Sequence, residues 1–191
     1  MDPGLSAKDV TVFWSPETDP GTVILGAWQA ISTVDSIVAP AIDAETSHTD
    51  SDGGVSLTLG RGLLSIHVLL LPGIAPGQRV IALLPLGTDG LDRIEAIARL
   101  WRMAHSLRLL PDARITVQQR RRLRRMLQAV DGHSEGASYR QIAEAIYGQS
   151  RVSETPWKTS ALRDATIDLV KDGLALIAGD YRSLLKRRRR L

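Results

Sequence analysis

The sequence contains no cysteine, which excludes disulfide bonds and thiolate metal sites and gives no indication of an oxidising compartment. Long hydrophobic runs are also missing, because the longest one, around residues 66–76, is too short to span a bilayer and is interrupted by Pro72. The first residues, MDPGLSAKD, lack the basic and apolar regions of a signal peptide. We therefore expect a cytoplasmic protein without a membrane segment.

Catalytic motifs are missing as well. The four histidines are scattered, and none has a second histidine or a carboxylate at metal-ligand spacing. There is no G-x-S-x-G elbow, P-loop or dinucleotide fingerprint, and residues 60–62 (GRG) are too short for a phosphate loop. Asp164 and Asp168 lie one helical turn apart, but Arg163 and Lys171 are near enough for ordinary ion pairing. We therefore expect no enzyme, no metal site and no cofactor.

Acidic and basic residues are unevenly divided along the chain. Residues 1–111 carry 7 Lys and Arg against 12 Asp and Glu, whereas residues 112–191 carry 17 against 9. The sign changes at Pro111-Asp112, which we take as the boundary between two domains, 1–111 and 112–191. A basic half beside an acidic half suggests an anionic partner for the basic half, although a basic surface can also simply be solvated.

The N-terminal half is predicted to consist mainly of β-strands. Apolar, β-branched runs are separated by clusters of turn residues, of which 44–54 is the most polar. Residues 60–62 should form the turn of a hairpin, and Pro85 should keep the last strand at a sheet edge. The expected strands cover residues 10–14, 22–28, 55–60, 63–71 and 79–86.

After Gly87 the apolar period changes from that of a strand to that of a helix. Residues 91–110 predict an amphipathic helix that closes the sheet. Because nothing catalytic is found in this half, we expect it to bind a partner or to mediate dimerisation. The apolar stripe of the helix is expected to consist of Leu91, Ile94, Ala98, Trp101 and Ala104 or His105.

The C-terminal half is predicted to be helical. Its first helix, 114–132, should end at Asp131-Gly132 and bury a stripe formed by Leu123, Met126, Leu127 and Val130. Five arginines without intervening acids repel one another, and a nearby phosphate backbone would relieve that repulsion. The alternative is a solvated helix face, since arginine is a good helix former. These arginines are Arg120, Arg121, Arg122, Arg124 and Arg125.

Residues 136–148 read GASYRQIAEAIYG and predict a short helix that cannot be stable alone in water. Ser138 and Gln141 match a capping box, and Gly148 should form the exit turn. Ala143 is small enough to let another helix approach closely. The apolar stripe of this helix is expected to consist of Ile142, Ala145 and Ile146.

A third helix is expected over residues 156–173, with Thr155 as its N-cap, Pro156 at its first position and Gly173 at its end. The linker before it, 149–155, is longer than the turn of a simple helix-turn-helix, which favours a variant of that motif. The expected buried side consists of Leu162, Ala165, Leu169, Trp157 and Val170. The other side, with Lys158, Thr159, Ser160, Arg163 and, further round, Thr166, has the chemistry of a recognition helix.

The chain then continues through a short apolar run and a turn at Gly179-Asp180 to a final helix, with Tyr181, Leu184 and Leu185 facing inward. Residues 186–190 form a basic tail, which either binds nucleic acid non-specifically or stays disordered.

The stretches GASYRQIAEAIYG, VSETPWKTSALRDATIDLVKDGLAL and GDYRSLLKRRRR resemble a proteobacterial family of transcription-factor DNA-binding domains, first described as a domain of unknown function. The resemblance extends to FWSPETDP (13–20) and LLLPG (69–73). Members occur on integrative and conjugative elements, and some are associated with type VI secretion. The resemblance implies a homeodomain-like or sigma-region-4-like helix-turn-helix fold and a role in regulating element-transfer genes.

We therefore predict an α+β protein with a small N-terminal β-sheet closed by a helix and a C-terminal helix-turn-helix domain. It should be a sequence-specific DNA-binding transcriptional regulator of genes for excision or transfer of a mobile element. The alternative is an antiactivator that masks another regulator through protein contact. Its partners would be double-stranded DNA and a second regulator protein or a second copy of the chain. The predicted DNA-binding residues are Arg120, Arg121, Arg124, Arg125, Ser138, Tyr139, Arg140, Arg151, Lys158, Thr159, Ser160, Arg163, Lys186, Arg187 and Arg188.

Overall fold

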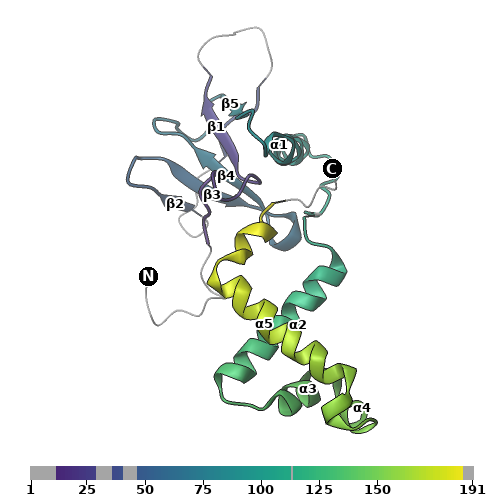
Figure 1. Ribbon diagram of the computed structural model, residues 1–191. Coiled ribbons are helices and arrows are strands. Elements are labelled where there is room, and N and C mark those ends of the chain that lie inside the picture. The colour runs from purple at the N-terminus through teal and green to yellow at the C-terminus, as the bar shows by residue number, and fades with distance from the viewer. Residues whose placement is uncertain (1–11, 29–35, 41–46, 113, 187–191) are drawn as a thin grey trace. The chain divides into compact units, whose positions relative to one another are not determined.

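The computed structural model describes residues 12–28, 36–40, 47–112 and 114–186 (Figure 1). The chain forms two compact units, one of Met1–Asp112 together with Leu185–Leu191 and the other of Ala113–Leu184. The first unit contains a mixed β-sheet and one long helix, and the second contains only helices. This arrangement confirms the predicted α+β fold class.

The sheet of the first unit has five strands in the order β2-β3-β4-β1-β5. β1 pairs in parallel with β4, whereas every other neighbouring pair is antiparallel. The central strands are rich in β-branched and leucine side chains, which suit a buried pleated surface. The strands are β1 (Val23–Ala27), β2 (Ser47–Thr49), β3 (Val55–Leu59), β4 (Ile66–Leu70) and β5 (Val80–Leu83).

Most of the strand predictions are confirmed. The runs at 22–28, 55–60, 63–71 and 79–86 each contain a strand, and β5 lies at an edge of the sheet as Pro85 suggested. β3 and β4 form the expected hairpin, whose connection includes a short 3₁₀ helix, η1 (Gly62–Leu64).

Two predictions about the sheet are wrong. Of the run at 10–14, residues 12–14 lie in the described part of the chain and form no strand there. Conversely, the polar stretch 44–54 contains β2, which pairs with β3 and forms the other edge of the sheet. Backbone hydrogen bonds to β3 form this short strand, and its polar side chains give no apolar alternation that could reveal it.

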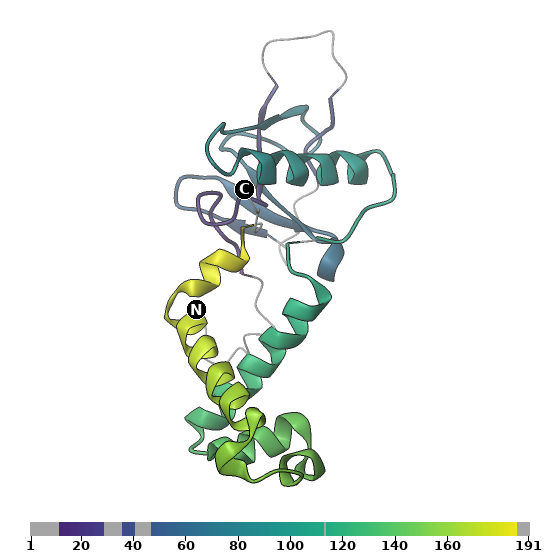
Figure 2. The same ribbon diagram turned by 45° about the vertical axis from the view of Figure 1, so that its right-hand side comes forward.

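The core of the first unit lies between the sheet and α1 (Gly90–Ala104), which lies across one face of the sheet (Figure 2). β4 shows the alternation of a strand with one buried face, since Ile66, Val68 and Leu70 are buried and the residues between them are only partly so. Ala96 and Leu100 are the apolar residues of α1 that complete this core.

The apolar stripe predicted for α1 exists but faces solvent. Leu91, Ile94 and Trp101 are 61%, 47% and 52% exposed, so the expectation that this stripe closes the sheet is wrong. The buried side is offset round the helix and carries Ala96 and Leu100, with Ile97 and Met103 partly buried against the same core. The helix also ends earlier than expected, before Ser106, which has a left-handed φ of 54°.

The FWSPETDP segment forms a turn that leads into β1. The Thr18 and Asp19 amides both donate to the Ser15 carbonyl oxygen at 2.9 Å. Asp19 is 1% exposed, and its carboxylate accepts from the Gly21 amide at 2.8 Å. The guanidinium of Arg93 on α1 donates to the Pro16 carbonyl oxygen at 2.7 Å. The motif therefore connects the start of the sheet to its helix.

The second unit is built from two long helices that cross, α2 and α5, with α3 packed against both (Figures 1 and 2). Its core combines Met126 and Ala129 of α2 with Ile142 of α3 and with Leu169 and Val170 of α5. The helices are α2 (Val117–Ser134), α3 (Tyr139–Tyr147), α4 (Gln149–Ser153), η2 (Trp157–Thr159), α5 (Ala161–Ala178) and η3 (Asp180–Leu184).

α3 confirms the predicted capping box. The Ser138 hydroxyl accepts from the Gln141 amide, while the Gln141 side chain accepts from the Ser138 amide at 2.8 Å. Gly148 follows the helix with a φ of 91°, as the exit turn requires. Ala143 is fully buried, whereas Ala145 is exposed and does not belong to the buried stripe.

Two of the helix ends that were assigned to glycine in this unit, those at Gly132 and Gly173, are wrong. α2 continues through Gly132 to Ser134, and a Cβ at Gly132 would lie 3.2 Å from Cγ1 of Ile142. α5 continues through Gly173, where a Cβ would lie 2.6 Å from Cγ2 of Val130. These glycines allow close packing between helices instead of ending them.

The boundaries around the predicted recognition helix also differ. The expected linker 149–155 contains α4, and Pro156 precedes the 3₁₀ helix η2. α5 begins only after Ser160, so Thr155 is not its N-cap. The expected final helix is η3, a 3₁₀ helix, in which Tyr181 and Leu184 are half-buried.

Candidate nucleic-acid interface

The arginines of α2 lie outside the core of the second unit. Arg121, Arg122, Arg124 and Arg125 are exposed. Arg120 is half-buried, and its guanidinium donates to the Ile115 carbonyl oxygen at 3.3 Å. The helix therefore presents several cations to solvent along its length.

A groove of about 400 Å³ runs along one side of α2 within this unit. Arg121, Arg122 and Arg125 line it with the spacing of a single helix face, and Arg124 is not part of it. The opposite wall includes Asp168 of α5. The groove cannot be seen in the sequence, because Tyr147 and Asp168 come from other helices, although the spacing of the three arginines places them on one side of α2.

Two of the groove arginines have partners on other helices. The guanidinium carbon of Arg125 lies 5.7 Å from the centre of the Tyr147 ring, within the range of a cation–π contact. Arg122 donates to a carboxylate oxygen of Asp172 at 2.6 Å. Among the described residues Arg121 and Arg124 have no carboxylate partner. The groove therefore retains positive charge that the surrounding chain does not neutralise.

The predicted DNA-binding residues at the start of α3 already make internal contacts. The Ser138 hydroxyl takes part in the capping box and donates to Gln141 Oε1 at 2.7 Å. Tyr139 is 37% exposed, and its ring stacks on that of His133 with 5.7 Å between centroids. Arg140 forms an i,i+4 ion pair with Glu144 at 3.0 Å. These side chains stabilise the helix, which reduces their availability to a partner.

The segment that leads into α5 contains two exposed polar side chains, Lys158 and Thr159, on η2. Ser160, by contrast, is 4% exposed, so the expectation that it faces outward is wrong. Its hydroxyl oxygen accepts from the Leu162 amide at 3.2 Å and from the Thr155 hydroxyl at 3.2 Å. Ser160 is therefore the N-cap of α5, and its burial follows from that role.

The outward side of α5 is cationic only at its beginning. Arg163 is half-exposed and lies 3.3 Å from a carboxylate oxygen of Asp164. Beyond it, Asp164 and Asp168 face solvent, and Thr166 is fully buried with its hydroxyl donating to the Leu162 carbonyl oxygen at 2.7 Å. Of the side chains expected on the outward side, Ser160 and Thr166 are therefore buried, and the first turn of α5 carries Asp164 beside Arg163.

The remaining predicted residues lie in separate places along the chain. Arg151 is exposed on α4, directly before η2. Lys186 belongs to the first unit, where its ammonium lies 2.9 Å from a carboxylate oxygen of Asp89. Arg187 and Arg188 lie outside the described residues. The exposed cations near the start of α5 are thus Arg151, Lys158 and Arg163.

A capped short helix packed on two long crossing helices with exposed arginines is an arrangement that suits a small DNA-binding domain. The chain belongs to the family described as the T6SS (type VI secretion system) transcription factor DNA-binding domain, whose family model matches residues 83–186. The match includes α1 as well as the helices of the second unit. No curated protein matches the chain. The protein is therefore a DNA-binding transcription factor and not an enzyme.

Two further findings apply to the described part of the chain. No helix there has both the length and the apolar composition needed to cross a bilayer. Likewise, no cluster of three or more His, Asp or Glu side chains there could hold a metal ion.

Proposed function

We propose that the protein is a sequence-specific transcriptional regulator whose second unit binds duplex DNA with its arginine-rich side. The observation that carries this proposal is that several arginines of α2 have no carboxylate partner among the described residues. The chain also belongs to a family of DNA-binding domains. Arg121, Arg124 and Arg125 bind phosphates, and the release of counterions from DNA supplies most of the affinity.

Base reading is assigned to the start of α5 and the residues just before it. Lys158 and Thr159 are exposed on η2, and Arg163 lies on the first turn of α5. The helix N-terminus adds a positive dipole end that favours a nearby phosphate. Arginine is suited to bidentate pairing with guanine, so Arg163 is the residue expected to give the strongest base preference.

The resemblance to regulators on mobile elements suggests the target genes. We propose that the chain acts in the cytoplasm on promoters of genes for excision or transfer of an integrative element. Recovery of bound DNA across the genome, followed by footprinting of one site, tests this assignment. Bound sites that are confined to unrelated housekeeping promoters would contradict it.

Fluorescence anisotropy with labelled duplexes tests the interface. Arg163→Ala should reduce the preference for the specific site over random DNA by about 1–3 kcal/mol, because one base contact is lost. Arg121→Ala with Arg125→Ala should weaken binding to all duplexes and lower the slope of log affinity against log salt by about 2, since two phosphate contacts are removed. Lys171→Ala, an exposed cation further along α5, is the matched control and should change neither property.

Two outcomes contradict the assignment. A salt slope that stays unchanged in the Arg121→Ala, Arg125→Ala variant excludes these arginines as phosphate contacts. An unchanged site preference in Arg163→Ala removes that residue from base reading. Absence of any duplex binding, combined with capture of a second regulator, favours the antiactivator alternative.

We also propose that the protein acts as a homodimer through the outward stripe of α1. A single recognition element reads few base pairs, and paired half-sites are the common solution. The stripe has the heptad-like spacing of a two-helix seam, with large side chains such as Leu91 and Trp101 on either side of the small Ala98.

Sedimentation equilibrium tests the dimer. Trp101→Arg places a charge in the seam and should shift the chain to a monomer, while Lys171→Ala should leave its mass unchanged. Because Trp101 is 52% exposed, the variant should keep the fold. A monomeric wild-type chain at micromolar concentration, or a Trp101→Arg variant that remains dimeric, contradicts this interface.

A further inference from the structure

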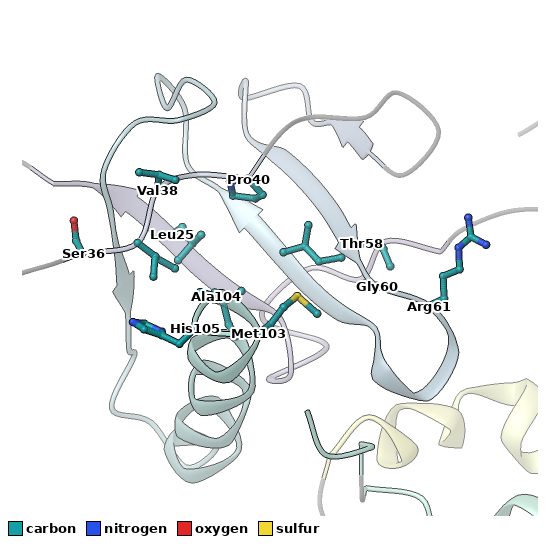
Figure 3. A pocket seen from close by; sticks show the side chains of 13 residues that line it. Leu25, Ser36, Val38, Pro40, Thr58, Gly60, Arg61, Met103, Ala104 and His105 are labelled. Atoms are coloured by element: carbon teal, nitrogen blue, oxygen red, sulfur yellow. The ribbon is translucent and has the colours of Figure 1, made fainter. Parts of the chain in front are cut away.

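The first unit contains an open cavity of about 810 Å³ at the end of α1 (Figure 3). It lies between the last turn of α1, the segment 36–40 and strands β1 and β3. The volume is within the usual range of pockets for small organic ligands, about 300–1,000 Å³. It is separate from the charged groove of the second unit, so it goes beyond the proposed DNA interface.

The walls of the cavity are mostly apolar. Leu25 of β1, Leu59 of β3 and Met103 of α1 line it from three different elements, and Val38 and Pro40 line the opposite side. Val38 is 56% exposed even though its side chain is apolar. A ligand with a hydrocarbon body would therefore remove apolar surface from water on both sides of the cavity.

Polar groups are few and lie at the ends of the cavity. Figure 3 shows Arg61 at one end and Ser36 and His105 at the other. Ser36 Oγ is buried and has no hydrogen-bond partner among the described residues. Such an atom is unusual in a folded protein unless a ligand or water completes its bonding. His105 stacks on Trp101, and its Nδ1 lies 2.8 Å from the Trp101 carbonyl oxygen, which leaves Nε2 for another contact.

The charges around the cavity favour an anionic ligand. Arg61 is exposed and forms no ion pair within the described part of the chain, and of the described residues that line the cavity none is acidic. An ammonium ligand would find no counter-charge there, whereas a carboxylate could pair with the guanidinium through two hydrogen bonds.

We propose that this cavity binds an amphipathic monocarboxylate, with its hydrocarbon body between α1 and residues 36–40 and its carboxylate at Arg61. The hydroxyl of Ser36 and Nε2 of His105 can bond a second polar group at the opposite end of the ligand. The site gives the sheet unit of a transcription factor a means to bind a small molecule.

Isothermal titration calorimetry on the full chain tests the site with hexanoate, octanoate and decanoate and with the corresponding alcohols as neutral probes. The carboxylates should bind, with affinity that rises with chain length, and the alcohols should bind more weakly. Arg61→Gln should weaken carboxylate binding about tenfold and leave alcohol binding unchanged, because only the charged pair is lost. The control Arg108→Gln removes an exposed cation that does not line the cavity and should have no effect.

Blocking the cavity gives an independent test. Ala104→Trp fills it from α1, and Val38→Trp fills it from the opposite wall; both positions are exposed, which favours retention of the fold. Either change should abolish binding of all probes. The matched control Leu86→Trp adds the same ring at a position that is 88% exposed and does not line the cavity, and it should preserve binding.

Three results overturn the proposal: no binding of any carboxylate up to about 1 mM, equal binding of carboxylates and alcohols, or unchanged binding in both blocked variants. None of these measurements involves DNA, so failure of the ligand site is distinguishable from failure of the DNA interface.

Discussion

Replacement of Gly173 by alanine tests the packing of α5 on α2, on which the core of the second unit depends. The added Cβ would lie 2.6 Å from Cγ2 of Val130 and 3.2 Å from the carbonyl oxygen of Met126. Favourable carbon–carbon contacts are about 3.5–4.0 Å, so the first distance is roughly 1 Å too short. The second contact involves backbone, which cannot rotate away.

The expected effect combines two opposing contributions. Overpacking of a core costs about 1–3 kcal/mol, whereas alanine in a helix interior is about 1 kcal/mol more favourable than glycine. Because a backbone atom takes part in the clash, we expect a net loss of about 1–2 kcal/mol in the free energy of unfolding. DNA affinity should fall only in proportion to the fraction of folded protein.

Urea denaturation, monitored by the circular dichroism signal of the helices, measures this change in the free energy of unfolding. Amide hydrogen exchange of α2 and α5 assigns it to the second unit, since the two units can unfold separately. Gly90→Ala is the control, because its Cβ would meet only the Pro85 carbonyl oxygen at 3.8 Å. It should be neutral or slightly stabilising.

A double-mutant cycle with Val130→Ala gives the decisive test. Val130→Ala removes the methyl group that the added Cβ would meet, so the double variant should lose at least about 1 kcal/mol less than the two single changes together. If Gly173→Ala instead stabilises the protein by about 1 kcal/mol, as at an open helix position, the close packing of these helices is refuted. Additivity within about 0.5 kcal/mol would refute it as well.

Two further predictions concern local interactions. Ser138→Ala removes the cap of α3 and should lower the free energy of unfolding, measured by urea denaturation, by about 0.5–2 kcal/mol. Ser138→Asp keeps a capping side chain and should retain most of the stability of the unchanged protein. Equal stability of all three proteins would contradict the capping role. The hydrogen bond from Ser15 lowers the pKa of Glu17, so Ser15→Ala should raise that pKa toward its ordinary value in an NMR titration. The ionised Glu17 should stabilise the fold at pH values above its unfolded-state pKa, and this stabilisation should be lost as the pH falls through its folded-state pKa. If the pKa of Glu17 is the same in the Ser15→Ala variant, the Ser15 hydroxyl is not the main cause of the lowered pKa.

Features that depend on neighbouring residues were predictable from the sequence. The Ser138–Gln141 capping box and the exit turn at Gly148 form within a few residues, and β1, β3, β4 and β5 follow runs of β-branched and leucine side chains. The division of charge and the spacing of the α2 arginines are likewise properties of the chain itself.

The sequence could not show which side of α1 is buried. Apolar residues occur on two sides of this helix, one with Ala96 and Leu100 and the other with Leu91 and Trp101. Periodicity alone does not distinguish these two sides, and only contact with the sheet decides which one is buried. The role of Gly173 was hidden for the same reason, since only contact with Val130 distinguishes a packing glycine from one that ends a helix.

The grouping of functional side chains was decided by tertiary structure alone. The charged groove joins Arg125 of α2 to Tyr147 of α3, and Asp172 of α5 neutralises one of its arginines. The cavity of the first unit likewise joins Ser36, Arg61 and the end of α1. Hydrogen bonds between residues close in the chain can be predicted from the sequence, because both partners are always near each other. The burial of a side chain, the pairing of charges and the lining of a cavity depend on which distant segments come into contact.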